Sequence, residues 1–514
     1  MRLEEVLFCA TAPQSPEQGA GTIALHDVQS TTLLATFKQT SAAPRCTAVL
    51  ESSNTQGGFM LAAQPGKSLL NVYNFQKDQI ALKIVLPEKL TCIAIDKSGR
   101  YCAGGTAQGG IYLWEIASGI LFNSWDAHYR RVNVLRFTND GTVLISGSED
   151  SSVNVWIVAR LVDNEAQNDP ANLHRSLSDH TLPITDIQCG VGAFLTCRIL
   201  TSSADHTAKL WDLSTGTLLT TFQFPQIIAH LAWDVTERIF FAADIDGSIH
   251  KVHLFQQRKN AAGDMIQEAV GGGGTNDIVR VGDNEQESQK KGPIQVGESV
   301  SAMAISMTST YLIVGTSTGV IHFYDFPSHQ LVRTISTHKG FSITHLTSFL
   351  KPLDLIGHIS LDLNVGSISD ARDALPAKPV QPFQRMKDSK SREAHEVTMF
   401  LQPNPTLPQN NPAEFNYEEF LRDHASFVRP FSDQNGSMGS SAFESSAAND
   451  KISELEAQVA QLKEQLGKAK GINDAMWDSV VQHVMTGENG KQDKVESTED
   501  GSGDSRRRKR SRGA

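Results

Sequence analysis

The sequence that decides the fold is LISGSEDSSVNVW, residues 144–156, which is matched by ILTSSADHTAKLWD, residues 199–212. In each stretch a hydroxyl residue stands four positions before an Asp, and a Trp stands six positions after that Asp. A His precedes each set. The two sets are His128, Ser146, Asp150 and Trp156, and His180, Thr201, Asp205 and Trp211. Their repetition indicates a shared role.

These four residue types can form one buried chain of hydrogen bonds. A turn Asp accepts from backbone amides and from an imidazole. The imidazole accepts from a Ser or Thr hydroxyl, and the hydroxyl oxygen accepts from an indole N–H, which can only donate. Because buried polar groups are costly unless satisfied, the four types are expected together. The alternative is a His–Asp pair activating a nucleophilic Ser, but recurrence at a repeat spacing favours a structural role.

The Trp position recurs along the first two-thirds of the chain. Tyr73, Trp114 and Trp156 are separated by 41 and 42 residues, and Val252 follows Trp211 by 41. Propeller blades repeat every 40 to 45 residues or so. Each unit alternates strand-like runs with Gly, Ser or Asp turns, as in four-stranded antiparallel blades. The pattern is typical of WD repeats and predicts an all-β fold, a seven-bladed WD40 β-propeller over residues 1–360. Six or eight blades are the alternatives.

The strand pattern also predicts where each blade lies. Inner halves begin near Cys46, Leu90, Val132, Ile184, Ala229, Val300 and Ile343. Outer halves span 22–38, 69–84, 110–125, 152–177, 207–222, 248–255 and 319–335. The first outer half has no inner half before it, and the last inner half has no outer half after it. We therefore expect the two ends to share one blade, which removes an exposed sheet edge.

Composition and local motifs argue against several function classes. The 514 residues carry a formal net charge of −11, which argues against nucleic-acid binding by the protein as a whole. No long apolar run or signal-like amino terminus is present, so we expect a soluble, unsecreted protein without membrane contact. The six cysteines lack metal-ligand spacing and are expected to be free thiols. We predict no catalytic, cofactor or metal site.

Two motif-like strings have simpler explanations. GTSTG, residues 315–319, matches a nucleophile elbow in letters but continues as a strand rather than a helix. GGGG, residues 271–274, lacks the Lys and Ser or Thr of a phosphate-binding loop. It lies in an insertion, about 256–292, which is expected to loop out disordered from the sixth blade. A second insertion lengthens the fourth blade and retains Leu161, Leu173 and Leu177, so we expect it to be ordered against the rim.

Beyond the propeller the sequence predicts three segments. Residues 361–448 form a Pro-rich linker with short aromatic segments, EVTMFLQP and EFNYEEFLRDHASFVRPF, which either contact the propeller or another protein or are incidental. Residues 449–486 form a coiled coil, most simply a homodimer; a heterotypic partner or docking onto the propeller is the alternative. Its heptad seam is Ile452, Leu455, Val459, Leu462 and Leu466.

The last segment, 487–514, is a disordered tail that ends in a basic cluster. The cluster comprises Arg506, Arg507, Arg508, Lys509, Arg510 and Arg512. Such density at a chain end indicates a nuclear localisation signal or a nucleic-acid contact, with a solvated charge run as the alternative.

Particular phrases around the repeats resemble one family. MRLEEVLFCATA at the amino terminus, DAHYRRVNVL at 126–135, SDHTLPITDI at 178–187, the long fourth blade and the heptad tail resemble the WD-repeat pre-rRNA-processing family. This is the fungal WD-repeat subunit involved in processing internal transcribed spacer 2, with an animal WD-repeat nucleolar counterpart. The two tetrads match the repeat motif, whereas other blades have Gln108, Thr318 or Lys67 in place of Asp.

The resemblance implies a non-enzymatic scaffold subunit of a nuclear pre-ribosomal complex, required for internal transcribed spacer 2 removal and large-subunit maturation. Implied partners are the other protein subunits, the pre-ribosomal particle and a dynein-like AAA ATPase, with direct rRNA contact open. Implied locations are nucleolus and nucleoplasm. The alternatives are a chromatin or replication-licensing scaffold and a ubiquitin-ligase substrate receptor, although Trp156 and Trp211 lack the W-D-x-R ending of such receptors.

Overall fold

The computed structural model describes residues 4–15, 19–51, 57–163, 172–259, 265–270, 278–282, 292–357 and 379–397, together with Gln461, Lys463, Glu464 and Lys468. The chain divides into two compact units, Met1–Asn404 and Pro405–Ala514. All the strands described belong to the first unit.

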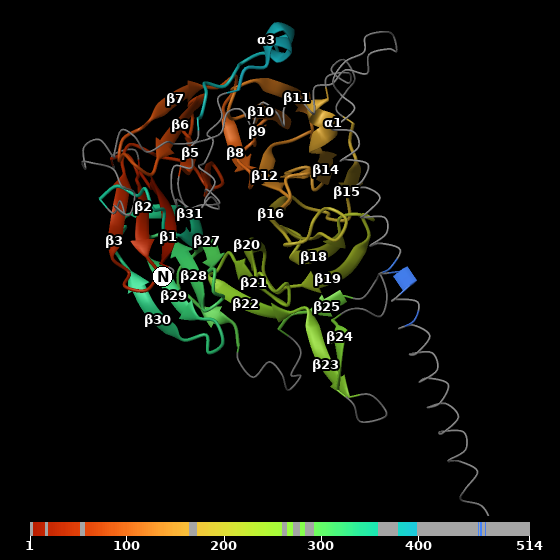
Figure 1. Ribbon diagram of the computed structural model, residues 1–514. Helices are drawn as coiled ribbons and strands as arrows, with labels where there is room; N and C mark the ends of the chain where they lie inside the picture. Colours follow the sequence, from red (N-terminus) through yellow and green to blue (C-terminus); the bar gives the residue numbers. More distant parts are fainter. Residues whose placement is uncertain are drawn as a thin grey trace, which may run out of the picture. The chain divides into compact units, whose positions relative to one another are not determined.

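Seven antiparallel sheets form the blades of a propeller around a common centre (Figure 1). Blade 1 contains β31 (Phe341–Leu350), β1 (Glu5–Pro13), β2 (Ile23–Asp27) and β3 (Leu33–Phe37). Blade 2 contains β4 (Thr47–Leu50), β5 (Phe59–Ala63), β6 (Leu69–Asn74) and β7 (Leu82–Val85). Blade 3 contains β8 (Leu90–Ile95), β9 (Tyr101–Thr106), β10 (Gly110–Glu115) and β11 (Leu121–Asp126). The predicted seven-bladed propeller is confirmed.

The remaining blades follow in chain order. Blade 4 contains β12 (Val132–Phe137), β13 (Val143–Ser148), β14 (Val153–Ile157) and β15 (Arg175–Leu177). Blade 5 contains β16 (Ile184–Cys189), β17 (Arg198–Ser203), β18 (Thr207–Asp212) and β19 (Leu218–Gln223). Blade 6 contains β20 (Ile228–Trp233), β21 (Ile239–Asp244), β22 (Ser248–His253) and β26 (Ile294–Gln295). Blade 7 contains β27 (Val300–Ile305), β28 (Tyr311–Thr316), β29 (Ile321–Asp325) and β30 (Leu331–Ile335).

The two ends of the propeller share blade 1, where β1 pairs with β31 from Glu5↔Leu350 to Pro13↔Phe341. We expected the carboxyl end to supply both inner strands of this blade, but it supplies only β31. The amino-terminal strand β1 takes the second place because its run EVLFCAT is buried on both faces. Phe8 and Phe349 lie 6.5 Å apart between ring centroids, so aromatic packing reinforces the closure.

The insertion at 256–292 is more ordered than its composition predicts, and the expectation of a disordered loop is wrong for its described parts. β23 (Phe255–Lys259) and β24 (Met265–Ala269) form a two-stranded hairpin, and β25 (Ile278–Arg280) adds a parallel strand to β19 of blade 5. Phe255, Val270 and Val279 pack against the core shared by blades 5 and 6. A few apolar anchors and edge pairing thus order a segment whose average composition is polar.

The helix α1 (Val158–Val162) follows β14 of blade 4 and contacts both β14 and β11 of blade 3. Leu161 and Leu177 are buried, whereas Leu173 is exposed. The second insertion therefore packs on the rim at two of its three predicted leucines. None of the helices within the described ranges combines the length and apolar character needed to span a membrane.

In its described part, the segment 361–448 also differs from the extended linker that the sequence predicts. Residues 379–397, which include α3 (Ser389–Ala394), contact blade 3 and extend the compact unit to Asn404. Phe383 is buried there, so this segment is held by packing rather than left extended in solvent. We call residues 379–397 the strap.

Candidate interaction surface

The first tetrad closes a hydrogen-bond chain within blade 4. His128, in the loop before β12, places Nδ1 3.1 Å from Asp150 Oδ2 and Nε2 2.8 Å from Ser146 Oγ. Trp156 Nε1 on β14 donates to the same Ser146 Oγ over 3.1 Å. Since the carboxylate can only accept, Nδ1 carries the proton and Nε2 accepts from the hydroxyl. A loop, a turn and two strands are tied together by this chain.

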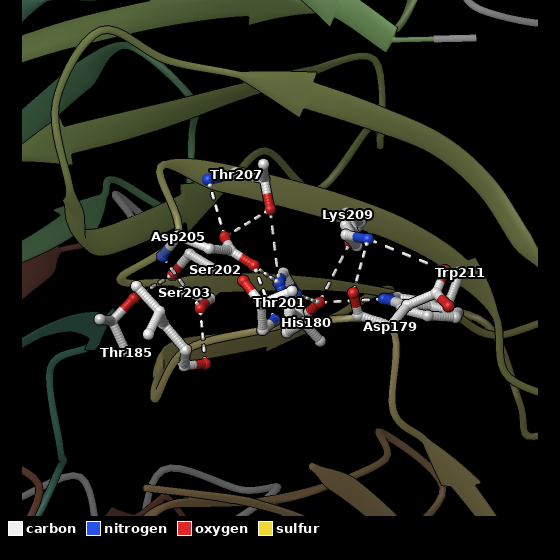
Figure 2. A network of polar contacts seen from close by, with 12 residues as sticks. Asp179, His180, Thr185, Thr201, Ser202, Ser203, Asp205, Thr207, Lys209 and Trp211 are labelled. Atoms are coloured by element: carbon white, nitrogen blue, oxygen red, sulfur yellow. Dashed lines mark hydrogen bonds and ion pairs between the residues drawn. The ribbon is translucent and has the colours of Figure 1, made fainter. Parts of the chain in front are cut away.

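Blade 5 repeats the arrangement with Thr in place of Ser (Figure 2). His180 Nδ1 lies 2.9 Å from Asp205 Oδ2, and His180 Nε2 lies 2.9 Å from Thr201 Oγ1. Trp211 Nε1 donates to Thr201 Oγ1 over 2.9 Å. The two histidine side chains are fully buried, so each chain of bonds is shielded from water. Low dielectric strengthens such a satisfied network.

Both turn aspartates are held ionised. Burial alone would raise the pKa of Asp150, but hydrogen bonds from His128 and Ser152 outweigh it and hold that pKa well below its ordinary value. The same balance applies to Asp205, where His180 and Thr207 donate. Each carboxylate oxygen already accepts a hydrogen bond from a protein donor. The two aspartates therefore serve to hold the structure together.

The tetrads also fix the loops that follow each histidine. Tyr129 N donates to Asp150 Oδ2 over 3.1 Å, yet the Tyr129 side chain is 99% exposed. In blade 5, Thr181 N donates to Asp205 Oδ2 over 3.2 Å, and the next residue, Leu182, is also exposed. An exposed aromatic and an exposed aliphatic side chain on a rigid backbone are suited to partner contact, because binding would cost little backbone conformational entropy.

Blade 1 replaces the tetrad with a histidine pair. His26 occupies the Trp position and lies with Nε2 2.9 Å from Nε2 of His338, which occupies the His position. Cys9 occupies the hydroxyl position. It pairs with Ala24, two residues before His26, just as Ser146 pairs with Asn154, two residues before Trp156. Pro13 stands where the Asp would be. Burial, and then His338, lowers the pKa of His26 to about 4.

Blade 3 keeps the Trp but loses the hydroxyl. Gly104 pairs with Tyr112 at the position of Ser146, and a Cβ there would lie 2.8 Å from Leu90 Cδ1. Trp114 is fully buried, and its Nε1 donates over 2.9 Å to the backbone oxygen of Gln384 in the strap. A residue 270 positions later in the chain thus satisfies the indole that the blade itself leaves without a hydroxyl.

The strap is held on blade 3 by backbone and aromatic contacts. Phe383 stacks on Trp114 with ring centroids 5.2 Å apart and planes 15° apart. Gln384 N donates to Gly119 O over 2.8 Å, and Gln381 N donates to Ile116 O over 3.1 Å. The strap is therefore held at the turn between β10 and β11 by backbone hydrogen bonds as well as by the stacked ring.

Charged groups of the strap extend this contact to the rim near blade 4. His395 Nε2 lies 2.7 Å from Glu115 Oε2. Arg392 donates to Val162 O at the end of α1 over 3.1 Å and lies over the Phe122 ring at 4.8 Å. These contacts hold the carboxyl-terminal part of the strap against blade 3 and α1.

The structure brings together all eight tetrad residues selected from the sequence. The heptad seam and the basic cluster lie outside the described residues. Sequence reasoning missed the strap contact, although Gly104 carried a signal: a blade with a buried Trp and no hydroxyl needs another acceptor. In the described part of the chain, no cluster of His, Cys, Asp and Glu has the composition of a metal site, and all six cysteines are free.

Comparison with known proteins gives a consistent result. A family model described as WD domain, G-beta repeat, matches residues 119–156 and 171–212, the two stretches that hold the tetrads. The pre-rRNA-processing protein IPI3 of Mycosarcoma maydis is 31% identical over 569 aligned residues, covering 94% of this chain and 97% of that protein. The pre-rRNA-processing protein crb3/ipi3 of Schizosaccharomyces pombe is 30% identical, over 60% of this chain and 70% of that protein.

An animal protein is similar over a shorter stretch. WD repeat-containing protein 18 of Homo sapiens is 32% identical, over 63% of this chain and 68% of that protein. The Mycosarcoma alignment therefore extends beyond the propeller. The alignment with the animal protein covers a fraction of this chain close to that of the propeller alone.

Proposed function

The chain belongs to the IPI3 family of pre-rRNA-processing proteins, and we propose that it is a scaffold subunit in ribosome biogenesis. The observation that carries this proposal is the extent of the match to the Mycosarcoma protein, which covers nearly the whole of both chains. A propeller with rigid, exposed loops suits a scaffold, since it offers surfaces without needing a reaction centre.

In finer detail, the scaffold supports removal of internal transcribed spacer 2 and maturation of the large ribosomal subunit. The test is depletion of the protein followed by rRNA hybridisation with spacer probes. Spacer-containing precursors should accumulate, and the tagged protein should recover large-subunit precursors. Normal precursor ratios after depletion would remove the basis for the proposal.

The partners are protein subunits of a pre-rRNA-processing complex and the pre-ribosomal particle, and a dynein-like AAA ATPase is a further candidate. Residues 449–486 associate as a homodimer through their heptad seam. The experiment is purification of the tagged protein with and without residues 450–485, with the mass of the recovered protein measured by light scattering. Loss of self-association only in the shortened chain supports this role of the seam. A monomeric full-length chain contradicts it.

The site of action is the nucleus, and the basic cluster at 506–512 directs the protein there. Replacing the six basic residues with Gln should move a fluorescent fusion out of the nucleus. If the variant stays nuclear but loses rRNA crosslinks, the cluster contacts RNA instead. A ubiquitin-ligase receptor is not favoured, because Trp156 and Trp211 continue as WIVA and WDLS.

A further inference from the structure

A group of charged side chains occupies the centre of the propeller. Arg45 precedes β4 of blade 2, yet its Nη2 lies 3.8 Å from Asp186 Oδ1 on blade 5 and donates over 3.4 Å to Ala229 O on blade 6. Blades 5 and 6 lie across the ring from blade 2 (Figure 1). The Arg45 side chain therefore reaches across the centre of the ring.

A second guanidinium converges on the same carboxylate. Arg136 on β12 of blade 4 donates through Nε to Ile187 O over 3.1 Å, and its Nη2 lies 3.8 Å from Asp186 Oδ1. At 3.8 Å both contacts with Asp186 are ion pairs rather than hydrogen bonds. Two cations thus share one anion, which leaves this group with an excess of one positive charge.

The carboxylate of Asp186 already accepts hydrogen bonds from two backbone amides. Asp186 is almost fully buried and accepts from Leu231 N and from Ile187 N, each over 2.9 Å. The arginine side chains, in contrast, are partly exposed, 24% for Arg45 and 34% for Arg136. Among the described residues, Ala229 O and Ile187 O are their hydrogen-bond acceptors, so other N–H donors are available to an incoming group.

Among the described groups that act on the Arg45 guanidinium, Asp186 is the only carboxylate, and Arg131 adds a further positive charge. Burial lowers the pKa of Arg45, Asp186 opposes this, and Arg136 and the exposed Arg131 lower it further. Burial, then Arg45, lowers the pKa of His230 to about 4. Burial, then Arg136, lowers the pKa of His345 to about 4. Both histidines are neutral at pH 7, so the excess charge stays on the guanidinium groups.

The backbone of Arg45 is held ready for this role. Its φ of 63° lies in the left-handed region, which is unfavourable for a residue other than glycine. The conformation is kept by Ile93 N, which donates to Arg45 O over 2.9 Å. The point from which the Arg45 side chain starts across the ring is therefore fixed by the backbone.

We propose that Arg45 and Arg136 form a binding site for one carboxylate of an acidic protein segment supplied by a partner. One carboxylate would balance the excess charge of the two guanidinium groups over Asp186. The planar fork of a guanidinium matches a carboxylate through paired N–H donors. Arg131, in the loop before β12, is exposed and acts electrostatically on Arg45, and arginine is enriched where partners bind. The proposal is independent of the role in rRNA processing.

The test measures binding of a capped hexaglutamate peptide to the full chain by calorimetry, with hexaglutamine as the neutral probe and inorganic phosphate at matched ionic strength. Hexaglutamate should bind and hexaglutamine should not. Arg136→Gln should weaken hexaglutamate binding about tenfold through the lost charge. Arg238→Ala, at an exposed arginine outside the ring centre, is the matched control and should bind as the parent chain does.

Asp186→Asn separates this site from a purely structural network. The amide oxygen still accepts from Leu231 N, but the competing charge is gone, so hexaglutamate should bind about tenfold more tightly. Equal binding in Arg136→Gln, weaker or unchanged binding in a folded Asp186→Asn, or binding of phosphate alone would each overturn the proposal. If Asp186→Asn fails to fold, Arg136→Gln decides.

Discussion

Blades 4 and 5 satisfy their buried tryptophans from within, whereas blade 3 borrows the acceptor for its tryptophan from the strap. In blades 4 and 5 the Trp indole donates to a hydroxyl on the neighbouring strand, two residues after the residue that pairs with the Trp. In blade 3 that position is Gly104, and the Trp114 indole donates to Gln384 O. The difference teaches that in blade 3 the departure from the repeat marks the place where another part of the chain docks.

The largest effect is expected where a tetrad is broken. Asp205→Ala leaves His180 and the backbone amide of Thr181 without their acceptor, so it should lower the free energy of unfolding by roughly 2 to 4 kcal/mol. Asp150→Ala should behave alike. Chemical denaturation gives the values, with Asp126→Ala, at an exposed position, as control. An unchanged midpoint in either tetrad variant would show that these networks do not stabilise the blades.

A smaller effect is expected at the strap. Phe383→Ala removes the ring stacked on Trp114 and should cost about 2 kcal/mol, below the usual loss for a buried Phe because the strap can detach while blade 3 stays folded. Trypsin should then cut faster near Lys387 and Arg392. Met386→Ala, which alters an exposed strap side chain, is the control. Equal cutting rates in both variants would refute detachment.

The closing blade should respond to acid before the tetrads do. An unfolded histidine binds a proton below about pH 6.5, whereas the pKa of His26 in the fold is about 4. The unfolded state therefore binds more protons, and stability should fall as the pH drops from about 6.5 towards 4, by up to about 1.4 kcal/mol per pH unit for this group.

The tetrad carboxylates titrate at lower pH. Their folded pKa values are depressed, so their contribution is complete above about pH 3.9 and declines only below it. His26→Leu should therefore make the stability profile less steep between pH 6.5 and 4, with the slope due to His230 and His345 left in place, while His206→Gln, at a turn of blade 5, should not change it. Unfolding curves from pH 7 to 4 measure both. A parent profile that is flat in this range would contradict the account of the histidine pair.

The smallest change in stability is expected at the exposed loops. Tyr129→Ala should alter the free energy of unfolding by less than about 0.5 kcal/mol, because the side chain is exposed. Recovery of the pre-ribosomal particle with the tagged chain should nevertheless fall, whereas Tyr129→Phe, which keeps the ring, should recover it. Undiminished recovery with Tyr129→Ala would exclude this side chain from the contact.

The repeat and the tetrads made most of the fold predictable. Inner strands begin close to their expected positions, and even the largest difference, β31 at Phe341 instead of Ile343, is small. Periodicity works here because every blade buries the same face of each strand. The tetrads were predictable because four polar residue types at fixed spacing must satisfy one another.

What escaped prediction depends on contacts between distant segments. β25 adds to β19, and Phe383 reaches Trp114, through pairings that have no local periodicity. The surrounding composition is polar or Pro-rich, which on average argues for disorder, although single apolar anchors decide the outcome. Arg45 stands one residue before an expected inner half, and only the closed ring brings its side chain to Asp186.

The most direct test compares the indole protons of Trp114, Trp156 and Trp211 by nuclear magnetic resonance hydrogen exchange, in the full chain and in Phe383→Ala. All three should be protected in the parent chain, because each donates to a buried acceptor. In Phe383→Ala only Trp114 should lose protection. Unchanged protection of Trp114, or equal loss at all three, would contradict the claim that the strap completes blade 3.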